Sequence, residues 1–156
     1  MIARRISKTL SLLSVVALAV CAAIAGTAAL AAEPGQCPQP RFTGKAPDDY
    51  LSRTNPVATD PASAKAGEGL FLGGQRAGNC AVCHGREGDG KGQLASQFDP
   101  PPRNFRCAQT IDGVADGQLF WIIRFGSPGT AMPPHARLSD EQVWQILAFL
   151  RSLTKK

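Results

Sequence analysis

Residues 80–84, with the sequence Cys-Ala-Val-Cys-His, constrain this chain more than any other segment. Two thiols three positions apart can each form a thioether with a vinyl group of one porphyrin, and the adjoining histidine can offer a ring nitrogen to the iron. A thioredoxin-like dithiol would need a βαβ context, which the sequence does not show. A zinc site would need two further nearby ligands, and the only other histidine is His135. The pattern therefore predicts one covalently bound haem c, held by Cys80, Cys83 and His84.

Residues 1–31 have the pattern of a secretory signal peptide rather than of a folded segment. Residues 1–8 contain three basic side chains and no acidic one, residues 10–32 are almost wholly apolar or small, and residues 29–31 (Ala-Leu-Ala) fit a cleavage site. The apolar stretch exceeds the ~18 residues that can span a bilayer, so an uncleaved membrane anchor is an alternative. A lipoprotein signal is a second alternative, because residues 18–21 (Leu-Ala-Val-Cys) loosely resemble a lipoprotein box. Cleavage after residue 31 is favoured and predicts export to the periplasm.

Removal of the signal peptide changes the charge of the chain. The full sequence has 17 basic and 12 acidic residues, and loss of Arg4, Arg5 and Lys8 leaves 14 against 12. Two haem propionates would bring this small positive charge close to zero. No basic cluster with interleaved aromatic residues remains in the mature part, so nucleic-acid binding is not supported.

Four cysteines remain once Cys21 has left with the signal peptide. If Cys80 and Cys83 bind haem, Cys37 and Cys107 are left as a pair, and disulfides belong to the same exported compartment as haem c. A disulfide between Cys37 and Cys107 is the favoured interpretation, and two free thiols are the alternative. The bond would close a loop of about 70 residues, a constraint worth up to roughly 4 kcal/mol.

The rest of the mature chain divides into an extension and one small domain. Residues 32–59 are rich in proline and polar residues and have no sustained period, which predicts an irregular extension over the surface. Residues 60–156 contain one haem motif and no internal repeat, so they are predicted to form a single domain. Because the apolar core of so short a domain is modest, the porphyrin is expected to act as part of it.

Helix-capping patterns define three longer helices in this domain. Asp60, followed by proline, is the predicted N-cap of the first helix. Asp116 is the predicted N-cap of a helix over residues 116–125, and Ser139 with Gln142 forms a capping box before the last helix. No segment has a convincing strand pattern. The fold class is therefore predicted to be all-α, with three to five helices around one covalent haem c.

The second axial ligand of the haem decides what the iron can do. Met132 is the only methionine outside the signal peptide, and it lies on a loop bounded by prolines, where core methionines are unusual. It is therefore the favoured sixth ligand, whereas His135 is interpreted as an exposed histidine. With both axial positions filled by protein atoms, the iron would exchange electrons rather than bind substrate. The prediction is an electron-transfer protein with no catalytic residues.

These features together resemble a class I cytochrome c over residues 60–156. The resemblance rests on the haem motif, the glycine-rich turn after it, Met132 on its loop and the terminal helices. It implies that the first and last helices cross near the haem, with a small residue meeting an aromatic one. Gly67 against Phe149 is the expected pair, and Trp144 is the second choice for the aromatic residue.

A more specific resemblance is to bacterial, periplasmic, single-haem cytochromes c, and it rests on residues 100–105 and 116–121. It implies that Arg103 faces a haem propionate, with a solvated arginine as the alternative. Some members of this branch accept electrons from quinoprotein alcohol dehydrogenases or feed terminal oxidases. The resemblance thus implies a soluble, monomeric carrier whose partners are a dehydrogenase, a respiratory complex or a terminal oxidase. The N-terminal extension and its cysteine pair are not part of the general family pattern.

Two other functions remain open at this point. The same chemistry would serve the haem subunit of a larger oxidoreductase, in which docking is permanent; a large exposed apolar patch or a co-purifying subunit would indicate it. An open-site haem enzyme or gas sensor would require Met132 to be absent from the iron. The sequence offers no distal acid–base pair for such chemistry, because His135 is the only histidine besides His84.

Overall fold

The computed structural model describes residues 33–40, 43–74 and 78–154. Within these ranges the chain forms six α-helices, one short 3-10 helix and loops, with no strand, so the prediction of an all-α fold is confirmed. The helix count exceeds the three to five expected, because α2 (Asp48–Leu51), α4 (Ala81–His84) and α5 (Ala108–Ile111) have only four residues each. A single turn is too short to show a hydrophobic period in the sequence. The predicted signal peptide lies outside the described residues.

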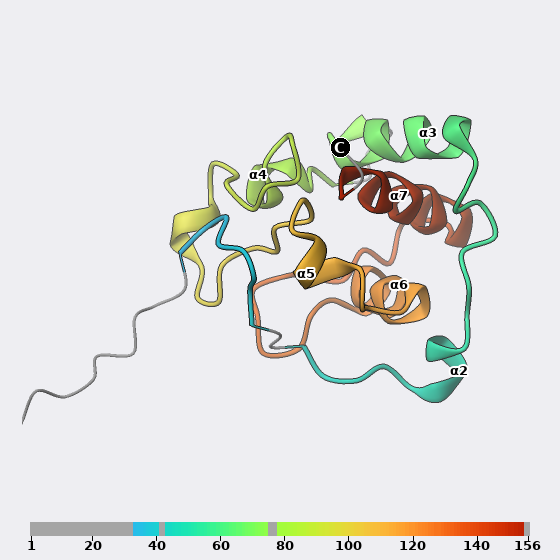
Figure 1. Cartoon of the computed structure of the whole chain (residues 1–156), viewed down its shortest axis with the longest axis horizontal. Helices are drawn as coiled ribbons and strands as arrows, with labels where there is room; N and C mark the ends of the chain where they lie inside the picture. The colour runs from blue at the N-terminus through green and yellow to red at the C-terminus, as the bar shows by residue number, and fades with distance from the viewer. Residues whose placement is uncertain (1–32, 41–42, 75–77, 155–156) are drawn as a thin grey trace, which may run out of the picture. The chain divides into compact units, whose positions relative to one another are not determined.

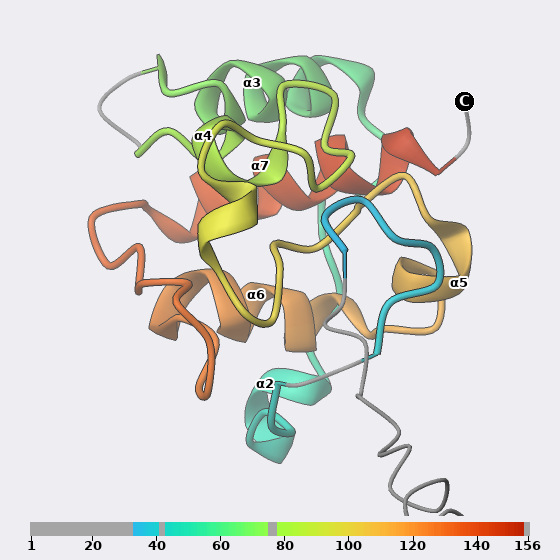
Figure 2. The same ribbon diagram turned by 90° about the vertical axis from the view of Figure 1, so that its left-hand side faces the viewer.

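Two long helices, α3 (Pro61–Phe71) and α7 (Asp140–Leu153), lie side by side in both views (Figure 1, Figure 2). Both begin at the predicted caps. The side chain of Asp60 accepts hydrogen bonds from the backbone N–H groups of the second and third residues of α3. Ser139 and Gln142 form the capping box of α7. None of the helices in the described ranges combines the length and apolarity needed to cross a membrane.

Gly67 lies where α3 packs directly against the backbone of α7. A Cβ atom at this position would lie 1.9 Å from the carbonyl oxygen of Gln145, so only glycine fits without moving the helices apart. The expected close approach is thus confirmed, but the nearest atoms belong to the backbone of α7. The ring of Phe149 instead packs on Phe71, with ring centroids 5.3 Å apart. Trp144 packs on α6, at 4.4 Å from an aromatic ring of that helix.

Helix α6 (Asp116–Phe125) has the predicted bounds but not the predicted N-cap. Its N-cap is Ala115, and Asp116 is the first helical residue. The reason is long-range: Nε and Nη2 of Arg151 in α7 donate to Oδ1 of Asp116 at 2.9 and 2.8 Å. Because the carboxylate of Asp116 binds Arg151, Asp116 does not cap α6. Nη1 of Arg151 also donates to the carbonyl oxygen of Ile111 at 2.7 Å, which joins α5 to the same ion pair.

The segment that precedes α3 is irregular apart from α2, and it is tied to the helices by buried amides. Gln118 of α6 is only 2 % exposed. Its Oε1 accepts from the backbone N–H of Ala46 at 2.8 Å, and its Nε2 donates to the carbonyl oxygen of Gly44 at 3.2 Å. Nδ2 of Asn55 donates to the carbonyl oxygen of Trp144 in α7 at 3.0 Å. The extension is therefore part of the domain surface rather than a loose appendage.

Substitution of the two neighbouring glycines in α3 should have opposite effects on stability. Gly67→Ala places a methyl group against the backbone of α7 and should lower the free energy of unfolding by about 1–3 kcal/mol. Gly69→Ala is the matched control, because a Cβ there meets nothing within 4 Å, and it should stabilise by about 0.5–1 kcal/mol. Guanidinium denaturation of the holoprotein measures both. Equal stability of the two variants would contradict the close crossing.

Candidate functional site

A cavity of about 640 Å³ lies inside the domain. This volume is within the range of about 300–1,000 Å³ that is common for cofactor sites. All five cofactor-binding residues predicted from the sequence line it: Cys80, Cys83, His84, Arg103 and Met132. Much of the remaining wall is apolar and comes from α3, α5, α6 and α7 and the segment before α5, including Phe71, Phe105, Ile111, Ile123, Leu147 and Leu150.

The two cysteines of the haem motif lie at the start and in the interior of α4. Cys80 caps the helix and Cys83 lies one turn later, a spacing that places both thiols on one side of it. Both are free and partly buried. Burial raises the pKa of the Cys80 thiol to about 11, and burial also raises the pKa of Cys83. A thioredoxin-like dithiol needs a lowered pKa, because the thiolate is the nucleophile, so these thiols do not fit that alternative.

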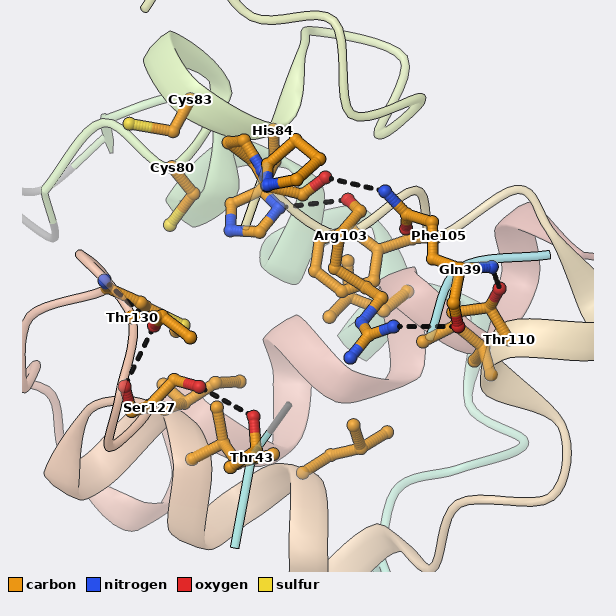
Figure 3. Close-up of a pocket in the computed structure, with 18 of the residues that line it drawn as sticks. Gln39, Thr43, Cys80, Cys83, His84, Arg103, Phe105, Thr110, Ser127 and Thr130 are labelled. Carbon is orange, nitrogen blue, oxygen red and sulfur yellow. Dashed lines mark hydrogen bonds between the residues drawn. The ribbon is translucent and has the colours of Figure 1, made fainter. Parts of the chain in front are cut away.

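His84 is buried, and its ring has a defined protonation state. Nδ1 lies 3.0 Å from the carbonyl oxygen of Arg103. A carbonyl can only accept, so Nδ1 carries the proton and Nε2 keeps its lone pair. Burial lowers the pKa of His84 to about 4, so the ring is neutral at pH 7. Figure 3 shows His84 on the same side of the pocket as Cys80 and Cys83.

The glycine-rich turn after His84 brings its hydrogen-bond acceptor into place. Gly85 and Gly88 have φ values of 79° and 69°, in the left-handed region that favours glycine. The backbone N–H of Phe105 donates to the carbonyl oxygen of Gly88 at 2.7 Å, so the turn and residues 103–105 run together. The tight turn predicted from the glycines is therefore confirmed.

Met132 is positioned by a hydrogen-bonded loop after α6. Oγ1 of Thr130 accepts from the backbone N–H of Met132 at 3.2 Å and donates to the carbonyl oxygen of Ser127 at 2.8 Å. The backbone N–H of Ser127 donates to the carbonyl oxygen of Met132 at 3.2 Å, which closes the loop. Figure 3 shows Ser127 and Thr130 across the pocket from His84. In the sequence this loop was marked by its prolines, but the hydroxyl of Thr130 and the backbone of Ser127 are the groups that hold it.

His135 differs from its prediction. It was expected to be exposed, but it is partly buried and lines the cavity. Its backbone N–H donates to the carbonyl oxygen of Ile123 in α6 at 3.0 Å, which draws the chain after Met132 back toward the core. Burial lowers the pKa of His135. It is thus a second imidazole at the same cavity.

The N-terminal extension contributes to the wall of the cavity, which the sequence did not reveal. Gln39, Pro40 and Thr43 line it. Nη1 of Arg103, expected to face a propionate, donates to the carbonyl oxygens of Pro40 at 3.0 Å and Gln39 at 3.4 Å. In the sequence, Cys37 was the one residue that indicated a contact between the extension and the rest of the domain.

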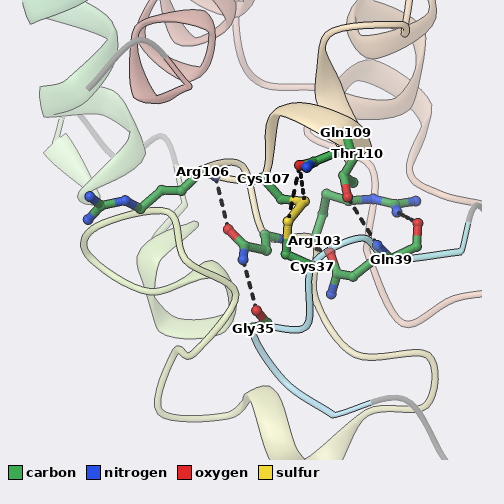
Figure 4. The surroundings of a disulfide bond; sticks show 9 residues. Gly35, Cys37, Gln39, Arg103, Arg106, Cys107, Gln109 and Thr110 are labelled. Carbon is green, nitrogen blue, oxygen red and sulfur yellow. Dashed lines mark hydrogen bonds between the residues drawn. A yellow bond between two sulfur atoms is a disulfide. The ribbon is translucent and has the colours of Figure 1, made fainter.

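A disulfide ties this extension to the segment before α5. Cys37 and Cys107 are bonded, with Cα atoms 5.6 Å apart (Figure 4). Neither cysteine lines the cavity, so the bond acts on the cavity wall through the residues beside it.

The chemistry of the cavity fits a covalently attached haem. Two thiols and a neutral imidazole with a free Nε2 lone pair lie on one side, and the loop of the thioether residue lies on the other. Aromatic and aliphatic side chains form much of the wall between them, as a flat apolar ligand requires. Within the described residues, no group of three or more histidine, cysteine, aspartate or glutamate side chains is arranged to hold a metal ion by itself.

Comparison with known proteins agrees with this chemistry. The sequence pattern of the cytochrome c family matches residues 64–154. A chain of the reducing HAO-like protein complex of Kuenenia stuttgartiensis is similar at 27 % identity and a TM-score of 0.51, over 60 % of this chain and 44 % of that one. This chain thus spans less than half the length of that neighbour.

Cytochrome cL from the marine methylotroph Methylophaga aminisulfidivorans is similar at 23 % identity and a TM-score of 0.48, over 79 % of each chain. The family pattern covers more than half of the sequence and contains every predicted haem-binding residue. The chain belongs to the cytochrome c family.

Proposed function

We propose that this protein is a single-haem carrier that moves single electrons in the periplasm, from a dehydrogenase or respiratory complex to a terminal oxidase. The observation that carries the proposal is the cavity itself. Its lining includes Cys80, Cys83, the neutral ring of His84 and the one methionine outside the predicted signal peptide. Family membership implies the covalent haem c that this set of residues fits, and cytochromes c exchange electrons with redox partners.

The residues of the cavity have separate roles in this proposal. Haem c, when bound, supplies an iron that changes between its ferrous and ferric forms. Cys80 and Cys83 would hold the porphyrin through thioether bonds, and Nε2 of His84 would bind the iron. The thioether of Met132 would be a second protein ligand to the iron and would favour the ferrous form, which raises the reduction potential. Arg103 lies at the same wall and would balance propionate charge.

The periplasmic localisation of the protein is also part of the proposal. Residues 1–31 have a signal-peptide pattern, and a disulfide joins Cys37 to Cys107. Disulfides persist outside the cytoplasm, where haem c is also attached. Some bacterial single-haem cytochromes c serve quinoprotein alcohol dehydrogenases, which makes such an enzyme the first donor to test.

A haem subunit of a larger oxidoreductase is the second candidate. The similarity to a chain of an HAO-like protein complex favours it. In the described part of the chain, exposed large hydrophobic side chains are limited to Phe125, which is 49 % exposed. Permanent interfaces are large and apolar, whereas redox encounters use small patches, so we rank the carrier first. Gel filtration of the protein purified from its native host separates the two, because a subunit elutes with its partners in fixed stoichiometry.

Removal of the Met132 side chain should open the iron to external ligands. The reduced wild-type holoprotein should keep its visible absorption spectrum under carbon monoxide, and reduced Met132→Ala should convert fully to the carbon monoxide form. His135→Ala is the matched control, since His135 also lines the cavity, and it should behave as the wild type. If His135→Ala opened the iron and Met132→Ala did not, His135 would be the ligand. Carbon monoxide binding by the wild type would favour an open-site enzyme or sensor.

Loss of both thiols should disrupt the fold as well as haem attachment. The double variant Cys80→Ala, Cys83→Ala leaves a cavity of about 640 Å³ whose wall includes core residues of α3 and α7. A domain of this size has little other apolar core to offset its conformational entropy, so the variant should lose its cooperative unfolding transition. Circular dichroism during thermal unfolding measures this. A sharp transition close to that of the holoprotein would show that haem is not part of the core.

A further inference from the structure

The carbonyl oxygen of Arg103 determines how the ring of His84 is held. It accepts the Nδ1 proton at 3.0 Å. A metal-binding histidine is oriented, and made more basic, by the acceptor on its second nitrogen. Whatever fixes the peptide unit of Arg103 therefore fixes His84, and with it the electronic character of the proximal ligand.

The side chain of Gln39 binds the backbone on both sides of Arg103. Its Nε2 donates to the carbonyl oxygen of Pro102 at 3.1 Å, and its Oε1 accepts from the backbone N–H of Asn104 at 2.7 Å. A carbonyl can only accept and a backbone N–H can only donate, so the amide has one orientation. One side chain from the extension thus spans residues 102–104.

Gln39 is itself held in place. Its backbone N–H donates to Oγ1 of Thr110 at 3.1 Å, and its carbonyl oxygen accepts from Nη1 of Arg103 at 3.4 Å. Two residues earlier, Cys37 is bonded to Cys107. Figure 4 shows Gln39 beside Arg103 and Thr110, near the disulfide. The side chain of Asn104 adds a bond from Nδ2 to the carbonyl oxygen of Gly35 at 2.9 Å.

We propose that Gln39 is a positioning residue for the proximal haem ligand: it holds residues 102–104 so that the Arg103 carbonyl stays in line with Nδ1 of His84, and it thereby lowers the reduction potential. This inference rests on the proposed function, in which His84 binds the haem iron. A strong hydrogen bond from Nδ1 makes Nε2 a better donor of electrons, which favours the ferric form. Weakening that bond shifts the potential to more positive values.

Two variants and one control test the role of Gln39. Gln39→Asn keeps the amide but is one methylene too short to reach both Pro102 and Asn104. Gln39→Leu keeps the size and removes both hydrogen bonds. Gln36→Leu makes the same change at an exposed position of the same segment. All three are made in the full chain and studied as holoprotein, with visible spectra to establish haem attachment and His84/Met132 ligation.

The two readouts are the hydrogen-exchange rate of the His84 Nδ1 proton, measured by NMR in the ferrous form, and the reduction potential. In Gln39→Asn and Gln39→Leu the proton should exchange at least about tenfold faster. The potential should become more positive by up to about 59 mV, which is a tenfold change in the ratio of oxidised to reduced protein. Gln36→Leu should match the wild type in both.

Several results would overturn the inference. Unchanged exchange and potential in both Gln39 variants would remove the role of Gln39 while leaving the proposed function intact. A shift of potential in Gln39→Leu alone, with wild-type proton exchange, would be an effect of polarity near the haem and not of positioning. If Gln39→Leu failed to bind haem, Gln39→Asn would decide by the same two readouts. A wild-type protein without attached haem or without His84 ligation would instead refute the proposed function.

Discussion

The hydrogen bond from Nδ1 of His84 to the carbonyl oxygen of Arg103 joins the two segments on which the site depends. The glycine-rich turn contains residues in the left-handed conformation, and its hydrogen bond to Phe105 keeps residues 103–105 alongside the haem motif. The extension closes over the same residues through Gln39 and the disulfide. The orientation of the His84 ring depends on all three, and burial keeps the ring neutral.

The helices supply a rigid frame for this arrangement. Gly67 lets α3 and α7 approach until backbone meets backbone, and Arg151 joins the end of α7 to the start of α6. The cavity wall takes side chains from each of these helices, including Phe71, Ile123 and Leu147. The backbone contact of Gly67 and the partly buried ion pair thus fix the relative positions of the helices that carry this wall.

Local sequence patterns predicted the parts of the site that depend on neighbours in the chain. The haem motif, the caps at Asp60 and Ser139 and the turn of glycines each consist of residues within a few positions of one another. The Arg103 carbonyl was missed because every residue has a carbonyl, so the acceptor of a hydrogen bond leaves no mark in the sequence. Gln39 was missed because its partners lie more than 60 positions away.

Long-range contacts also explain two of the predictions that were wrong. Asp116 has the residue type of an N-cap, but its carboxylate binds Arg151, 35 positions later. His135 lies in a polar stretch, but its backbone bond to Ile123 draws it to the cavity. In both cases a partner distant in the sequence prevailed over the local preference.

The disulfide divides the two sides of the cavity topologically. His84 and Arg103 lie within the covalent ring that Cys37 and Cys107 close, whereas Met132 lies on the open chain beyond it. Separation of the ring's ends is forbidden while the disulfide is intact, but the loop of Met132 is held only by hydrogen bonds and packing. The disulfide therefore limits how far the chain around His84 and Arg103 can open, and it places no such limit on the loop of Met132.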